Sequence, residues 1–135
     1  MYKILYIEDE FDMRDDMPAV LAPYDLQVTS PGSIIEALGL FQEQDFDLVL
    51  LDICMPPTED MPIEEIDYGR ATGLEVARRL KAIKPEVRLV AFTVVRDEEM
   101  LHKMRVAGIC HVINKPSGVQ EIANGISSVL AASHK

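Results

Sequence analysis

The stretch DLVLLDICMPP, from Asp47 to Pro57, decides the fold of this chain. Four apolar residues, Leu48 to Leu51, run directly into Asp52, and two prolines follow soon after. An uninterrupted apolar run of this kind is typical of a strand that is covered on both faces, as in a parallel sheet. A buried strand seldom ends in a charge that has no use. The sequence therefore predicts a central strand whose end carries the chemistry of the protein.

Four further apolar runs occur along the chain, and segments of helical periodicity lie between them. The five predicted strands are Ile4–Ile7, Leu26–Thr29, Leu48–Leu51, Val87–Phe92 and Ile109–Ile113. Strands that alternate with helices predict a parallel sheet with helices on both faces. With right-handed crossovers we expect the strand order 2-1-3-4-5, which is a flavodoxin-like, doubly wound α/β fold. One domain should span residues 1–135.

Several predicted helices begin at residues that can accept hydrogen bonds from free backbone N–H groups. The capping-box pattern, a hydroxyl followed three residues later by Glu or Gln, occurs at Ser33–Glu36, Thr72–Glu75 and Ser117–Gln120. Asp97 is a candidate cap for another helix. The first helix, near Phe11–Leu21, contains Pro18, which predicts either a kink or a helix that begins near Pro18 with Asp16 as its cap.

Composition limits the classes of protein to which the chain can belong. The net charge is -10, from 23 acidic and 13 basic residues, which argues against direct binding of nucleic acid. Cys54 and Cys110 make neither a disulfide framework nor a zinc site, which favours a reducing compartment. The N-terminal apolar run is too short for a signal peptide, and no run has the length of a membrane span. We therefore expect a cytoplasmic protein without a membrane segment.

The residues at the carboxyl ends of the predicted strands form one candidate site. Parallel strands end at the same edge of a sheet, and ligands bind there. The side chains that should converge are those of Glu8, Asp9, Asp52, Thr93 and Lys115. Clustered carboxylates repel one another unless a cation joins them, and oxygen ligands without His or Cys suit Mg²⁺. Because the lysine can neutralise a phosphate, this pattern indicates phosphoryl transfer to a carboxylate.

These motifs resemble those of response-regulator receiver domains, the phosphoacceptor modules of two-component signalling, along nearly the whole chain. ILYIEDE resembles the first strand with its acidic pair, and DLVLLDICMP resembles the strand that ends in the phosphorylated aspartate. AFTV resembles the strand with the switch hydroxyl, and INKP resembles the lysine–proline after the last strand. Each motif is moderately specific, whereas the ordered set at this spacing is strong.

The resemblance implies a role for each matching residue. Asp52 would accept a phosphoryl group, Thr93 and Lys115 would contact it, and the bond between Lys115 and Pro116 would be cis. The implied ligands of Mg²⁺ are Glu8, Asp9, Asp52 and the backbone carbonyl of Cys54. The donor would be a histidine kinase or a phosphotransfer protein. The chain would then be a switch rather than an enzyme, with only self-catalysed phosphotransfer and slow autodephosphorylation.

The expected partners downstream are an output domain or a separate output protein, and the domain could also form a homodimer. A runner-up interpretation is a pseudo-receiver, which would use the same fold for protein interactions that do not depend on phosphorylation. A haloacid-dehalogenase-like phosphatase is disfavoured because Cys54 stands where its second acid would be needed.

Three features depart from the pattern of the family. Val112 stands where receivers usually carry an aromatic ring, and Val94 stands where a small residue usually follows the hydroxyl. The acidic loop from Pro57 to Thr72 is roughly a dozen residues longer than common connections. Two interpretations of the loop remain open: a lid or partner surface beside Asp52, or a solvated insertion.

Overall fold

The computed structural model describes residues 1–132, and for Phe11 and Asp12 it describes the backbone alone. Within this part of the chain, five strands form one sheet: β1 (Tyr2–Ile7), β2 (Leu26–Thr29), β3 (Leu48–Leu51), β4 (Leu89–Thr93) and β5 (Ile109–Asn114). The strands are parallel and lie in the order β2-β1-β3-β4-β5. The predicted α/β fold and strand order are therefore confirmed.

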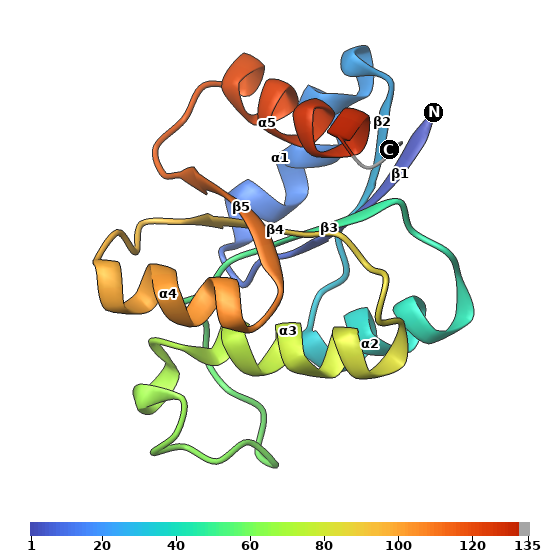
Figure 1. Ribbon diagram of the computed structural model, residues 1–135. Coiled ribbons are helices and arrows are strands. Elements are labelled where there is room, and N and C mark those ends of the chain that lie inside the picture. The colour runs from blue at the N-terminus through green and yellow to red at the C-terminus, as the bar shows by residue number, and fades with distance from the viewer. Residues whose placement is uncertain (133–135) are drawn as a thin grey trace.

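Helices cover both faces of this sheet. They are α1 (Phe11–Leu21), α2 (Ile34–Glu43), α3 (Thr72–Ile83), α4 (Glu98–Val106) and α5 (Val119–Ala132), with 3₁₀ turns η1 (Ala22–Tyr24) and η2 (Asp67–Gly69). Figure 1 shows α1 and α5 on one face of the sheet and α2, α3 and α4 on the other. None of the helices in the described part of the chain has the length and hydrophobicity that a membrane span requires.

The position of β3 in the sheet explains why all four residues from Leu48 to Leu51 are apolar. All four of its side chains are fully buried. Val49 and Leu51 face the core beneath α2, α3 and α4, whereas Leu48 and Leu50 face the core beneath α1 and α5. Because successive side chains of a strand point to opposite faces, a strand covered on both sides needs apolar residues throughout.

Two of the predicted helix caps are confirmed. The hydroxyl oxygen of Ser33 accepts a hydrogen bond from the backbone N–H of Glu36 at 3.1 Å. The carboxylate of Asp97 accepts one from the N–H of Met100, also at 3.1 Å. Each bond satisfies a donor that the first turn of the helix leaves free, as the sequence pattern predicted.

The predicted caps at Thr72 and Ser117 are wrong. Thr72 is the first residue of α3 and is fully buried, and its hydroxyl donates into the protein interior rather than accepting from the helix. The hydroxyl of Ser117 donates to the backbone carbonyl of Asn114 at 2.5 Å. Each hydroxyl donates a hydrogen bond to a backbone carbonyl of the preceding segment, and this bond takes the place of the predicted bond with the first turn of the helix.

Helix α1 runs through Pro18, so the alternative that begins near Pro18 with Asp16 as its cap is wrong. Proline has no N–H to donate to the carbonyl four residues earlier, which belongs to Arg14. The hydroxyl of Ser30 donates to this carbonyl instead, at 2.9 Å. A residue after β2 thus supplies the hydrogen bond that Pro18 cannot make.

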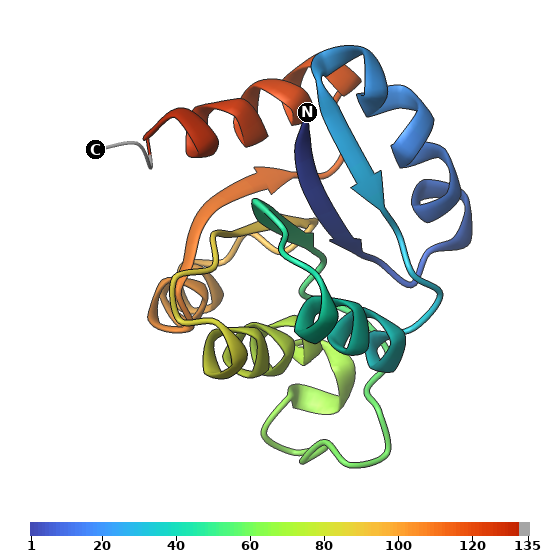
Figure 2. The same cartoon turned by 90° about the vertical axis from the view of Figure 1, so that its right-hand side faces the viewer.

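The acidic loop between β3 and α3 packs partly onto its own domain. Met61 and Ile66 are buried in the core beneath α2, α3 and α4. Ile63 and Tyr68 remain exposed, at 44% and 72% of their surface. Ile66 therefore faces the core of the domain, whereas Ile63 and Tyr68 face solvent. Figure 2 shows the loop projecting from the layer of α2 and α3, away from the sheet.

Candidate functional site

Strand pairing brings the predicted residues to one edge of the sheet. Ile7 of β1 pairs with Leu51 of β3, and the N–H of Asp52 donates to the carbonyl of Ile7 at 3.1 Å. One carboxylate oxygen from each of the three acids that follow these strands, Glu8, Asp9 and Asp52, lies within 4.8 Å of the others. The register of two neighbouring parallel strands therefore builds the acidic cluster.

Lys115 follows β5, the strand at one edge of the sheet, and its side chain extends to this cluster. Its N–H donates to the carbonyl of Thr93 at 3.0 Å, which fixes the backbone where β5 ends. Its Nζ lies 2.6 Å from Oε2 of Glu8 and 3.1 Å from Oδ2 of Asp52. The peptide bond to Pro116 is cis, as the resemblance implied. The ammonium thus neutralises part of the negative charge that the acids gather.

Glu8 is held from several directions. Its side chain is almost fully buried, Oε2 accepts a hydrogen bond from the hydroxyl of Tyr6 at 3.2 Å, and Oε1 accepts one from the N–H of Glu10 at 3.2 Å. The pKa of Glu8 is raised from 4.5 to about 7, first by burial and then by the charge of Asp52, against the opposing effect of the hydrogen bond from Lys115. Glu8 therefore exchanges its proton near neutral pH when no other cation is bound.

Two aromatic residues belong to the site but were missed in the sequence. Tyr6 stands two positions before Glu8, and its buried hydroxyl, beside the Glu8 charge, has a raised pKa because of burial first and that charge second. The alternation of a strand places residues i and i+2 on one face, which is the signal that could have found Tyr6. The Nζ of Lys115 lies 5.2 Å from the ring centroid of Phe92, a cation–π contact.

The carboxylate of Asp52 is oriented by donors on both oxygens. Its side chain is nearly buried, and Oδ1 accepts hydrogen bonds from the N–H groups of Ile53 at 2.7 Å and Cys54 at 3.3 Å. Oδ2 faces the ammonium of Lys115. The thiol of Cys54 is exposed and free, and partial burial, followed by the charges of Asp52 and Asp9, raises its pKa.

Thr93 lies at the same edge but is not joined to the cluster by a hydrogen bond of its side chain within residues 1–132. Its fully buried hydroxyl accepts from the N–H of Val95 at 3.3 Å. Val94, which follows it, is 61% exposed. Val112 is half-buried against the core beneath α2, α3 and α4. Because this residue is a valine, its position carries no aromatic ring.

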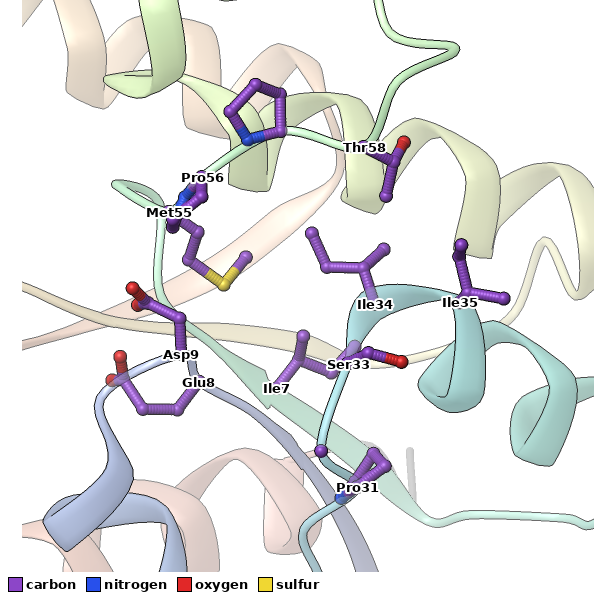
Figure 3. A pocket seen from close by; sticks show the side chains of 12 residues that line it. Ile7, Glu8, Asp9, Pro31, Ser33, Ile34, Ile35, Met55, Pro56 and Thr58 are labelled. Atoms are coloured by element: carbon purple, nitrogen blue, oxygen red, sulfur yellow. The ribbon is translucent and has the colours of Figure 1, made fainter.

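Two of the three acids, Glu8 and Asp9, line an apolar cleft of about 210 Å³. In Figure 3 the carboxylates of Glu8 and Asp9 lie side by side at one end, and the side chains of Ile7, Ile34 and Met55 extend along it. The donor set at the acidic end contains oxygen only, without His or a thiolate among its three members. Such a set fits a hard cation such as Mg²⁺.

A doubly wound parallel sheet with acids and a lysine at its carboxyl edge defines the class of protein: a flavodoxin-like α/β domain with an acidic site. The family model for the response regulator receiver domain matches residues 4–127, so the chain belongs to this family. It is a family of signalling domains from two-component response regulators.

Relatives and solved structures agree with this assignment. The chain is 29% identical over 132 residues to the response regulator receiver protein CpdR of Brucella abortus, covering 98% of this chain and 99% of that protein. It is 23% identical over 128 residues to the sporulation initiation phosphotransferase F of Bacillus subtilis, covering 95% and 93%. A CheY-like receiver domain from Methanospirillum hungatei shares the fold, with a TM-score of 0.82, 21% identity and coverage of 99% and 97%.

Proposed function

We propose that this chain is a phosphorylatable receiver in which Asp52 accepts a phosphoryl group from a phosphohistidine of a histidine kinase or phosphotransfer protein. The observation that carries the proposal is the setting of Asp52. Backbone N–H groups hold one of its oxygens, and the ammonium of Lys115 lies 3.1 Å from the other. A carboxylate with a fixed direction and a cation beside it is suited to attack on phosphorus.

In the proposed reaction, one carboxylate oxygen of Asp52 forms a bond to phosphorus while the bond between phosphorus and the donor imidazole nitrogen breaks. The imidazole leaves with the electron pair, and Asp52 becomes an acyl phosphate. Lys115 then pairs with a phosphoryl oxygen, and the hydroxyl of Thr93 donates to another. Mg²⁺, held by Glu8, Asp9, Asp52 and the backbone carbonyl of Cys54, would neutralise charge on the transferred group.

The pseudo-receiver remains a second candidate because of one observation. Val112 is half-buried in the core and has no ring to move, so the aromatic switch of typical receivers is missing at this position. In the leading proposal, phosphorylation changes binding to a downstream output domain or protein through Thr93 and Lys115 alone. In the alternative, the same surface binds its partner whether or not Asp52 is phosphorylated.

The test is incubation of the protein with acetyl phosphate and Mg²⁺, followed by intact-mass analysis and phosphate-affinity electrophoresis. We expect the mass to increase by one phosphoryl group, and we expect no increase in Asp52→Asn. An unmodified wild-type protein would support the pseudo-receiver. Modification that persists in Asp52→Asn would place the acceptor at another residue.

A further inference from the structure

The turn that follows the phosphoacceptor strand is held by the far end of the acidic loop. The N–H of Met55 donates to the carbonyl of Gly69 at 3.1 Å, and the N–H of Gly73 donates to the carbonyl of Ile53 at 2.8 Å. The hydroxyl of Thr72 donates to the carbonyl of Met55 at 2.5 Å. These three hydrogen bonds, which we name the loop clamp, join residues 53–55 to residues 69–73.

Thr72 is the side chain on which the clamp depends. It is fully buried, and its hydroxyl lies between the carbonyls of Met55 and Gly69, at 2.5 and 3.2 Å. A hydroxyl has one proton to donate, and the shorter distance assigns it to Met55. The predicted role of Thr72 as a helix cap is thus replaced by a bond across the base of the loop.

Gly73 shows how closely the two segments approach. A Cβ atom at this position would lie 2.3 Å from the carbonyl oxygen of Asp52 and 2.5 Å from Cα of Ile53. The start of α3 therefore rests directly on the backbone of the phosphoacceptor. A shift of Thr72 and Gly73 is transmitted to Asp52 because no flexible side chain separates them.

The clamp leaves the carbonyl of Cys54 available. The carbonyls of Ile53 and Met55, on either side, accept hydrogen bonds from Gly73 and Thr72. The Cys54 carbonyl accepts none from any residue that the structure describes, although its N–H donates to Asp52. Because both neighbouring peptide groups are fixed, the direction of this free carbonyl is fixed as well.

We propose that Thr72 is a positioning residue for the cation site: it holds the turn so that the Cys54 carbonyl is already oriented as a ligand. This inference rests on the proposed binding of Mg²⁺ at Glu8, Asp9 and Asp52. Thr72 is not among the residues proposed to bind the cation or to contact the phosphoryl group. Through the clamp, the conformation of the acidic loop and the affinity for Mg²⁺ are coupled, and the coupling acts in both directions.

The test compares Mg²⁺ binding by calorimetric titration in Thr72→Val, Thr72→Ser and the control Thr58→Val. Thr58 lies in the same loop, and within residues 1–132 its hydroxyl makes a hydrogen bond to exposed Asp60 and to no other residue. Loss of a group that orients a metal ligand typically weakens affinity by about 10- to 100-fold. We expect a loss of about 10-fold in Thr72→Val, recovery in Thr72→Ser and no change in Thr58→Val.

Stability is measured on the same samples, because Thr72→Val also removes a buried hydrogen bond. Titrations are done at a temperature where each variant is folded by circular dichroism. A folded Thr72→Val protein that binds Mg²⁺ as tightly as wild type would overturn the proposal alone. Wild-type binding that is absent, or that is unaffected by Asp9→Ala, would instead overturn the cation site and the proposal together.

Hydrogen exchange gives a readout that needs no metal. The N–H of Met55 is part of the clamp, so it should be protected in the wild type and should exchange faster in Thr72→Val. The N–H of Val49, in β3, is the reference for global stability. Equal changes at Met55 and Val49 would show a general loss of stability and would contradict a local clamp.

Discussion

The shortest ion pair of the site joins Lys115 to Glu8, at 2.6 Å between Nζ and Oε2. It links the end of β5 to the end of β1, across the strands between them. In the unphosphorylated protein, the lysine that the proposed mechanism assigns to the phosphoryl group is therefore paired with an acid of the proposed cation site. A cation bound at Glu8, as proposed, would compete with this pair, whereas the contact of Lys115 with Asp52 at 3.1 Å would remain.

Protonation of Glu8 should make the stability of the cation-free protein depend on pH. Its pKa is about 7 in the folded protein and near 4.5 in the unfolded chain. The folded state therefore keeps a proton that the unfolded chain loses, and the contribution of Glu8 to stability falls as pH rises from about 4.5 to 7. We expect the difference in unfolding free energy between wild type and Glu8→Gln to change over this window, measured by urea denaturation. A constant difference would contradict the raised pKa.

Mg²⁺ should stabilise the folded protein. A ligand at ten times its dissociation constant adds about 1.4 kcal/mol to the free energy of unfolding. We expect the melting temperature to rise with millimolar Mg²⁺ in the wild type and to stay nearly constant in Asp9→Ala. An equal rise in both proteins would show that the cation binds elsewhere.

Removal of the lysine should destabilise the protein while sparing the cation site. In Lys115→Ala, the buried carboxylates of Glu8 and Asp52 lose their counterion, which costs on the order of 3 kcal/mol when no cation is present. Mg²⁺ should recover more stability in this variant than in wild type. Lys103→Ala is the control, because its pair with Glu99 is exposed and contributes about 0.5 kcal/mol or less. Phosphorylated Lys115→Ala should show a smaller conformational change, and an unaltered one would contradict the role of the lysine.

Two glycines give a matched test of the contact between α3 and Asp52. Gly73→Ala places a methyl group against backbone atoms of Asp52 and Ile53, and we expect a loss of roughly 2 kcal/mol or more. Gly39→Ala, in α2, meets no atom within 4 Å and should gain about 0.5–1 kcal/mol from helix propensity. Denaturant unfolding measures both. Similar effects in the two variants would refute the close approach.

The acidic loop is proposed to be a partner surface beside Asp52. Replacement of exposed Ile63 and Tyr68 by Ser should leave stability within about 0.5 kcal/mol and should weaken binding to the output partner or the kinase. Deletion of the loop, with Pro57 joined to Thr72 by a short Gly-containing turn, should also lower stability, because Met61 and Ile66 lose their places in the core. Unchanged stability, phosphorylation and partner binding in the deletion variant would show that the loop has no such role.

The sequence predicted the features that depend on strand order. Continuous apolar runs in alternation with helices imply a parallel sheet, and a parallel sheet places the residues after its strands at one edge. Glu8, Asp52 and Lys115 meet for this reason alone, although 107 positions separate the first from the last. Their convergence could therefore be predicted without knowledge of individual side-chain conformations.

The features that the sequence did not reveal depend on contacts between distant residues. Thr72 fits the capping-box pattern as well as Ser33 does, and only the nearby carbonyl of Met55 decides the direction of its hydroxyl. Pro18 leaves a helix start and a kinked continuous helix both open, and the sequence does not show that Ser30 supplies the missing hydrogen bond. A local sequence pattern shows which hydrogen bonds a side chain can make, and the tertiary fold determines which of them forms.

Cys54 gives the molecule a chemical reporter of its own site. The thiolate is the reactive form, and the charges of Asp52 and Asp9 help to suppress it. Neutralisation of these carboxylates should therefore speed the alkylation of Cys54. Cys110, near the start of β5 and thus toward the opposite edge of the sheet, is a second free thiol in the same chain. The ratio of the two alkylation rates would report the charge of the site without an engineered probe residue, because Cys110 serves as an internal standard in the same molecule.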